Sequence, residues 1–377
     1  MNPPFPHRLA GLRAASRGML DAVPEHDLTR QSHAELSPLL WHVGHVFFVE
    51  HYWLAECVFG DHDITDHWRT LYFPELCAKG ERSARLPDPD AMRDWTRAVA
   101  ARSDAYWAAT AEMDHALLTD GYLEAFVRQH YAQHLETMRL ACDQLALGHA
   151  TRPAATALAP ASPECATTHV PAHTATIGTD DVAAYDNEKP AFETRVAAFD
   201  IADGPVTNAQ WLGFMEAGGY YRPELWDAAG WAWREAAGVT HPQHWRPAEG
   251  HGWHVPGDGE HTIADAPVHG IGWYEARAFA RYANARLPAE IEWEAARRAD
   301  CLRDLHRVWE WCADAFHPYP GFTAFPYEAY SQSWFDGDHF VARGGSRHTE
   351  PDVLRPGFRN FYPPAHRHVR AGLRLAF

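Results

Sequence analysis

The sequence lacks a long apolar stretch. No hydrophobic run in its 377 residues approaches the roughly 18 residues that a membrane-spanning helix needs. The segment Met1–Arg8 has three prolines and no continuous apolar core, so we expect no secretory signal. These absences argue against a membrane protein and favour a cytoplasmic one.

Cysteine is also scarce. The six cysteines are scattered, and none forms a C-x-x-C pair. A zinc ribbon is therefore not expected, and a chain of this length needs no disulfide framework. We interpret these cysteines as reduced and mostly structural.

Basic residues are few relative to acidic ones. Lysine and arginine number 33 against 50 acidic residues, for a formal charge of −17. A nucleic-acid or anionic-membrane binder needs a basic surface, so this balance disfavours both kinds of partner. By contrast, the 26 histidines and 16 tryptophans are unusually many. Such a histidine excess suggests metal or proton chemistry.

Glycine is rare in the first 150 residues, where leucine, alanine, arginine and glutamate recur at helical spacing. The pattern predicts long helices near 6–23, 35–59, 88–115 and 120–147. Pro38 suits a first helical turn, and Pro87-Asp88-Pro89-Asp90 supplies a helix start. Four such helices predict an up-and-down bundle over residues 1–150.

The composition changes after this bundle. Residues 151–176 are rich in alanine, threonine and proline without an apolar period, which predicts a linker. Residues 177–377 contain glycine and aromatic clusters, with their clearest helices expected at 272–283 and 288–300. We therefore predict a second domain of irregular α+β type, in agreement with a length that exceeds one domain of about 150 residues.

A histidine pair in the helical half is the strongest chemical signal. His130 and His134 are four residues apart, so on a helix both imidazoles project from nearly the same face. Two neutral imidazoles so placed can bind a divalent transition metal. A third ligand would come from another helix, where His42 and His45 are candidates. Bundle interiors commonly hold such metals, although incidental histidines are the alternative in a histidine-rich chain.

Three histidine ligands would leave three octahedral positions for substrate and oxygen. Fe(II) suits such a site, while zinc, nickel and manganese remain alternatives on ligand type alone. Glu136 lies about 200° around the helix from His134, so we expect it to face away from the metal. It would then support the site indirectly or pair with Arg139 or another surface group.

Longer motifs resemble a known family. The segment Ser37–His45, followed by H-x-x-x-H-x-E at 130–136, resembles the DinB-like domain of ergothioneine-type sulfoxide synthases. Segments of the C-terminal half are similar, in order, to a formylglycine-generating-enzyme-like domain: Asp186–Pro190, Pro205–Trp211, Arg286–Glu294, Val308–Trp311, Arg343–Ser346 and Arg359–Phe361. The resemblance implies a DinB-like four-helix bundle followed by a C-type-lectin-like α+β domain.

The resemblance also implies a reaction and its metal ligands. Members of the family join hercynine, the trimethylated betaine of histidine, to a sulfur donor with non-haem Fe(II) and O2. By this resemblance the iron ligands are His45, His130 and His134. His42 is the rival ligand, but the family's ligand follows a small residue, here Gly44.

Three residues match the hercynine-binding positions of the family. Gln133 matches a glutamine that hydrogen-bonds the substrate imidazole, and Asn360 matches an asparagine near the trimethylammonium group. Phe361 replaces the usual tryptophan. A phenyl face still attracts a quaternary ammonium group by cation–π contact, though less strongly than an indole.

Two residues depart from the donor-binding pattern of the family. Synthases that use γ-glutamylcysteine commonly have an aspartate and an arginine where this chain has Tyr362 and His366. Loss of both charges should weaken the binding of a zwitterionic donor. Tyrosine and histidine suit sugar hydroxyls, so we expect the selenosugar of the selenoneine synthase branch. Cysteine, γ-glutamylcysteine or another small thiol is the alternative donor.

Two further pairs match the family more weakly. Arg82 and Arg85 correspond to a basic loop that contacts the donor in relatives, with solvated loop arginines as the alternative. Tyr327 and Tyr330 could place a phenol near the iron as a proton donor, but packing in an aromatic loop is the interpretation we favour.

Formylglycine generation itself is not expected, because no paired cysteines follow Arg343-Gly344-Gly345-Ser346. Cys312 should instead pack as a small apolar residue. The leading hypothesis is oxidative C–Se or C–S bond formation between small molecules. A metal-dependent thiol transferase that needs no O2 and a non-catalytic ligand-binding protein are alternatives.

Overall fold

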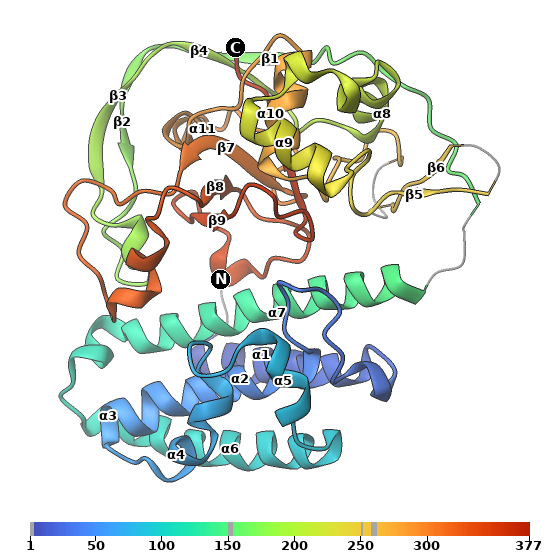
Figure 1. Ribbon diagram of the computed structural model, residues 1–377. Coiled ribbons are helices and arrows are strands. Elements are labelled where there is room, and N and C mark those ends of the chain that lie inside the picture. Colours follow the sequence, from blue (N-terminus) through green and yellow to red (C-terminus); the bar gives the residue numbers. More distant parts are fainter. Residues whose placement is uncertain (1–3, 150–153, 250–251, 258–261) are drawn as a thin grey trace. The chain divides into compact units, whose positions relative to one another are not determined.

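Long helices form the first part of the chain and short strands much of the second (Figure 1). The computed structural model describes residues 4–149, 154–249, 252–257 and 262–377. These divide into a helical unit, Met1–His149 with His348–Val353, and an α+β unit, Ala150–Arg347 with Leu354–Phe377. The predicted fold class is confirmed.

Four long helices form the framework of the helical unit: α1 (Phe5–Gly18), α2 (Leu39–His51), α6 (Pro89–Ala109) and α7 (Tyr122–His149). A π-helical turn (Tyr52–Glu56) and α3 (Cys57–Phe59) extend α2. Two helices that the sequence pattern did not predict, α4 (Asp63–Tyr72) and α5 (Lys79–Arg85), come before α6. No helix in the described ranges is long and apolar enough to cross a membrane.

Helix α2 lies in the middle of this unit. All 13 of its residues are buried, and it packs against α6 and α7. A helix without a solvated face is stable only when neighbours surround it. Every polar side chain on α2, including His42 and His45, therefore lies inside the unit, where polar atoms depend on internal partners.

The starts of α6 and α7 follow from local sequence. Asp88 accepts a hydrogen bond from the backbone N–H of Asp90 at 2.9 Å, and Pro89 takes the first helical position, as predicted. Before α7, Asp120 and Gly121 adopt positive φ angles of 52° and 74°. This left-handed pair ends the preceding turn, so that α7 begins at Tyr122.

A segment from far along the chain completes the helical unit. Residues His348–Val353 belong to it, and their 3-10 turn contacts α7. Glu350 accepts a hydrogen bond from Arg139 at 2.6 Å. Buried Glu136 accepts one from the Thr349 hydroxyl at 2.7 Å. Arg139 and Glu136 therefore both have partners in this segment.

Strands of the α+β unit are short. Antiparallel pairs join β1 (Thr167–Val170) with β4 (Phe199–Ala202), β2 (His173–Ile177) with β3 (Phe192–Val196), and β5 (Arg246–Pro247) with β6 (Trp253–His254). A four-stranded sheet has the order β10 (Ala371–Leu373), β7 (Trp309–Ala315), β8 (Phe340–Arg343) and β9 (Asn360–Tyr362). The longer helices of the α+β unit are α8 (Asn208–Glu216), α9 (Ala228–Ala237), α10 (Trp273–Tyr282) and α11 (Glu290–Arg298).

The linker expected at 151–176 ends earlier than predicted. Residues 167–170 form β1, and β2 begins at His173. These strands bury only some of their side chains, such as Val170 and Ala175, so their alanine- and threonine-rich sequence carries a weak apolar pattern. The helices expected at 272–283 and 288–300 are α10 and α11.

Buried ion pairs fix the four-stranded sheet. Arg343 on β8 donates to Glu294 at 2.5 Å, and Arg359 donates to both carboxylate oxygens of Glu290 at 2.9 Å. The bidentate contact between Arg359 and Glu290 fixes the direction of the side chains as well as their distance. Because Arg359 directly precedes β9, this contact sets the position of Asn360.

Cys312 lies in the apolar core of the α+β unit. Its side chain is fully buried, and burial raises the pKa of its thiol well above the usual range. A protonated buried thiol is a poor nucleophile. The predicted role as a small packing residue is confirmed.

Candidate metal centre

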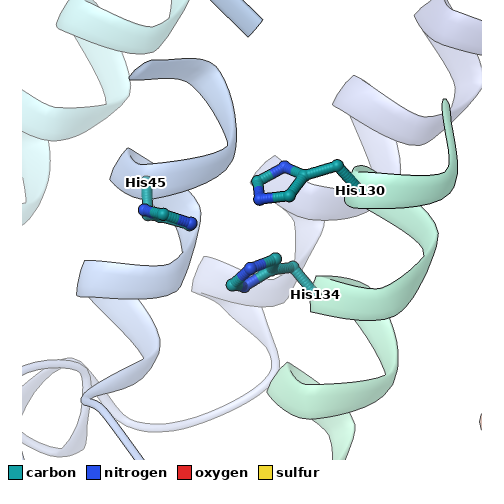
Figure 2. A group of neighbouring side chains, drawn as sticks. All are labelled: His45, His130 and His134. Atoms are coloured by element: carbon teal, nitrogen blue, oxygen red, sulfur yellow. The ribbon is translucent and has the colours of Figure 1, made fainter. Parts of the chain in front are cut away.

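Three histidines from two helices converge in the helical unit. His45 projects from α2, and His130 and His134 project from α7 (Figure 2). One ring nitrogen of each lies within 4.8 Å of the others, and the ring centroids are 4.5–5.1 Å apart. Elsewhere in the described ranges, no other three histidine, cysteine or acidic side chains come this close.

Helix α4 orients His45. The Nδ1 atom of His45 lies 2.8 Å from the backbone carbonyl oxygen of Tyr72, the last residue of α4. A carbonyl only accepts hydrogen bonds, so Nδ1 carries the proton and Nε2 keeps the lone pair that a metal requires. The Trp41 indole stacks on the imidazole at 4.5 Å, with 14° between the ring planes. Both contacts fix the plane of the ring.

Gly44 makes this arrangement possible. A β-carbon at this position would lie 2.0 Å from the hydroxyl oxygen of Tyr72, so any side chain would displace the phenol. The small residue before the ligand thus has a physical reason, which is the close approach of Tyr72 to α2. Nothing in the sequence pattern points to Tyr72 itself, because its contribution is a backbone carbonyl.

His42 lies next to the three histidines. Its Nδ1 atom is 3.1 Å from Nδ1 of His134, and its side chain is buried. The group that could hold a metal contains His45 and not His42. This geometry favours His45 as the ligand from α2.

Burial keeps these imidazoles unprotonated. Desolvation holds the pKa values of His45 and His130 well below the usual range, and it lowers the pKa of His134 to about 4. For His134, the nearby Arg82 charge contributes to this lowering after desolvation. A metal binds the neutral imidazole. The three histidines therefore fit a divalent transition metal in donor type, in charge and in convergence.

Arg82 is not in a loop, contrary to the prediction. It lies on α5 with 4% of its surface exposed, so the solvated alternative is wrong as well. Its guanidinium lies 3.9 Å from the centre of the Trp41 ring and donates to the carbonyl oxygen of Cys77 at 3.0 Å. Arg85, on the same helix, is exposed and donates to Thr70 at 3.0 Å. Whether either arginine contacts a donor stays a prediction.

The two residues expected to bind the trimethylammonium group, Asn360 and Phe361, are neighbours on β9 and face opposite sides of it. The Asn360 amide donates to the Tyr362 hydroxyl at 2.9 Å. Phe361 stacks on Phe316 at 4.0 Å, with 14° between the rings. The amide oxygen of Asn360 accepts from the backbone N–H of Phe361 at 3.0 Å. Neighbouring side chains of a strand point to opposite faces, so the Asn360 side chain shares a face with Tyr362 and not with the Phe361 ring. One face of the Phe361 ring is already covered.

The two candidate tyrosines differ in environment. Tyr330 packs on Tyr185 with ring centroids 4.6 Å apart, and burial raises the pKa of its phenol well above the usual range. Tyr327 contacts Tyr330 edge-on and is 42% exposed. Packing thus accounts for Tyr330, and the catalytic role stays a prediction for both.

The remaining candidates lie on different units. Gln133 directly precedes His134 on α7 and is partly exposed. His366 follows β9 and packs edge-on against His368, with ring centroids 5.0 Å apart. Their proposed contacts with hercynine and the donor stay predictions.

Known families match both units. Residues 8–138 match the DinB superfamily. Residues 155–306 and 301–377 match the sulfatase-modifying factor enzyme 1-like domain. The second match begins within the segment that we expected to be a linker.

Relatives extend over most of the chain. The hercynine oxygenase of Mycolicibacterium thermoresistibile is 34% identical and covers 93% of this chain and 90% of its own length. The hercynine oxygenase of Mycobacterium tuberculosis is 32% identical and covers 98% and 97%. The formylglycine-generating enzyme of Streptomyces coelicolor is 33% identical, but over 30% of this chain and 40% of its own.

Replacing His130 or His134 by alanine should abolish Fe(II) binding and leave the helical content nearly unchanged. In this assignment the imidazoles would be metal donors, whereas the buried apolar residues of α7 pack in the bundle. Anaerobic Fe(II) titration and circular dichroism measure the two properties. The control His26→Ala removes a histidine whose side chain is 75% exposed. Retained iron in both ligand variants would contradict the assignment.

Gly44→Ala should weaken Fe(II) binding by displacing Tyr72, whose carbonyl orients His45. Overpacking of this kind destabilises by about 1–3 kcal/mol. Gly11→Ala on α1 is the matched control, since its new β-carbon would meet no atom within 4 Å. Calorimetric metal titration and thermal denaturation of both variants test this. Unchanged metal affinity in Gly44→Ala would show that the Tyr72 contact is dispensable.

Proposed function

The chain belongs to the hercynine oxygenase family, and from this membership we propose that it is an Fe(II)- and O2-dependent enzyme acting on hercynine. The observation that carries the proposal is the convergence of His45, His130 and His134 in the helical unit. Identity of 34% to a hercynine oxygenase, over 93% of the chain, supports the substrate.

The chain's own residues would hold the reactants. Three neutral histidines would hold the metal, and the metal would supply the redox and Lewis-acid chemistry for a reaction with O2. Gln133, beside His134, offers an amide that both donates to and accepts from an imidazole. Asn360 and Phe361 are the candidates for the trimethylammonium end, and because they face opposite sides of β9, only one of them would contact it. Fixing hercynine in this way converts the encounter of two substrates into a step within one complex.

The donor in this proposal is a selenosugar. The C–Se bond replaces the Se–H bond of the donor and a C–H bond of the hercynine imidazole, and O2 accepts the electrons and protons released. Tyr362 and His366 support this choice, because neither supplies the carboxylate or guanidinium that a zwitterionic thiol peptide pairs with. The Tyr362 hydroxyl already accepts a hydrogen bond from Asn360. A hydroxyl in this position can also donate, as recognition of a sugar requires.

A sulfoxide synthase activity with cysteine, γ-glutamylcysteine or another small thiol is the second candidate. Its support is the identity to hercynine oxygenases over nearly the whole chain. Both candidates share hercynine, Fe(II) and O2, and they differ only in the donor.

Fe(II)-loaded protein mixed anaerobically with hercynine and one donor, then exposed to O2, should consume O2 only when hercynine is present. We expect O2 to be consumed fastest with the selenosugar, and we expect the mass spectrum to show a product that contains selenium. Oxygen-electrode traces and mass spectrometry measure both, with His134→Ala as the inactive control. No hercynine-dependent consumption with any donor would contradict the proposed enzyme. Faster turnover with a thiol would favour the second candidate.

The double substitution Tyr362→Asp and His366→Arg should shift the preference toward γ-glutamylcysteine. Each restored charge-assisted contact is worth about 1.5–3 kcal/mol, or roughly tenfold to a hundredfold in relative preference. Hercynine affinity should match that of Tyr362→Phe, because both variants leave Gln133 and Phe361 untouched and both remove the hydroxyl that accepts from Asn360. Competition kinetics with both donors measures the ratio, and Tyr362→Phe is the control that removes only the hydroxyl. An unchanged ratio would place both residues outside the donor pocket.

A further inference from the structure

The imidazoles of His42 and His134 are in hydrogen-bond contact through their Nδ1 atoms, beside the proposed metal ligands. The Nδ1 atoms of His42 and His134 are 3.1 Å apart, and their rings are inclined by 51°. His42 precedes His45 by three residues on α2, so one turn of this helix carries both. Its side chain is 4% exposed, which excludes a role as a surface group.

The distance requires one proton between the two nitrogens. A metal bound at Nε2 of His134 leaves the ring's proton on Nδ1, from which it donates to Nδ1 of His42. His42 then carries its own proton on Nε2. A protonated ring would instead oppose N–H to N–H.

We propose that His42 is a positioning residue for the metal ligand His134, whose tautomer and ring orientation it fixes by accepting the Nδ1–H hydrogen bond. The identity of the metal as iron rests on the proposed function, whereas the positioning role applies to any divalent metal at these ligands. His45 is oriented by the Tyr72 carbonyl, so each helix contributes a ligand held by a neighbouring acceptor.

The two acceptors differ in one respect that makes the proposal testable. The Tyr72 carbonyl belongs to the backbone and cannot be removed by substitution, whereas the His42 imidazole can. Asparagine places its amide oxygen about where Nδ1 of histidine lies, bonded to the same γ-carbon, and it accepts a hydrogen bond. Leucine fills a similar volume and cannot accept one.

The test is a titration of metal-free, full-length protein with Co(II), followed by its visible absorption spectrum. His42→Leu should weaken Co(II) binding about 10–100-fold and alter the ligand-field bands, because His134 loses its fixed orientation. His42→Asn should recover most of the affinity and the wild-type spectrum. His51→Leu is the matched control: this buried histidine on α2 contacts Ser103 at 3.1 Å and should leave Co(II) binding unchanged.

The outcomes separate the possible roles. Wild-type affinity in His42→Leu would overturn the proposal in favour of packing alone, and complete loss of Co(II) in both His42 variants would show that His42 is itself a ligand. These measurements involve neither hercynine nor O2, so they stand even if the proposed enzyme activity fails.

Nitrogen-15 histidine spectra of the Zn(II)-loaded wild type test the same inference where a variant does not fold. His134 should carry its proton on Nδ1 and His42 on Nε2. The opposite tautomer of His42 would overturn the proposal.

Discussion

The contact between Tyr72 and Gly44 is the constraint on which the arrangement of the three histidines depends. It lets the end of α4 approach α2 closely enough for a backbone carbonyl to reach the ring of His45. From there the arrangement extends outward, since Trp41 stacks on His45 and the buried Arg82 lies over Trp41. The Trp41 indole thus contacts both the Arg82 guanidinium and the His45 imidazole, and its position restricts the imidazole plane.

The burial of α2 explains why so many polar groups around the histidines are paired. A helix with no solvated face gives its polar side chains no water to bind, so each side chain depends on what the neighbouring helices offer. The same dry surroundings keep the imidazoles neutral without any acidic partner. Burial therefore affects both the protonation of these histidines and their orientation.

Much of the architecture was predictable because it rests on local signals. Helical spacing located the bundle, Asp88 and Pro89 marked the start of α6, and the i, i+4 spacing brought His130 and His134 to one face. Strands β1 and β2 escaped detection because short, half-exposed strands carry little apolar pattern.

The surroundings of the histidines were not predictable, since they arise from tertiary packing. A backbone carbonyl such as that of Tyr72 leaves no mark in sequence, and the burial of Arg82 depends on where α5 packs. Likewise, the pairing of Asn360 with Tyr362 follows from strand alternation, and only the assignment of β9 makes it visible. The spacing along one helix was thus predictable from sequence, and the contacts between helices and strands were not.

The six residues from His348 to Val353 have a consequence for how this protein can be divided. The chain enters the α+β unit once, leaves it to complete the helical unit, and returns. A fragment ending at residue 149 would keep the three histidines but would lose the hydroxyl that binds buried Glu136 and the carboxylate that binds Arg139. Exchanging residues 1–149 between relatives would therefore separate Glu136 from Thr349 and Arg139 from Glu350.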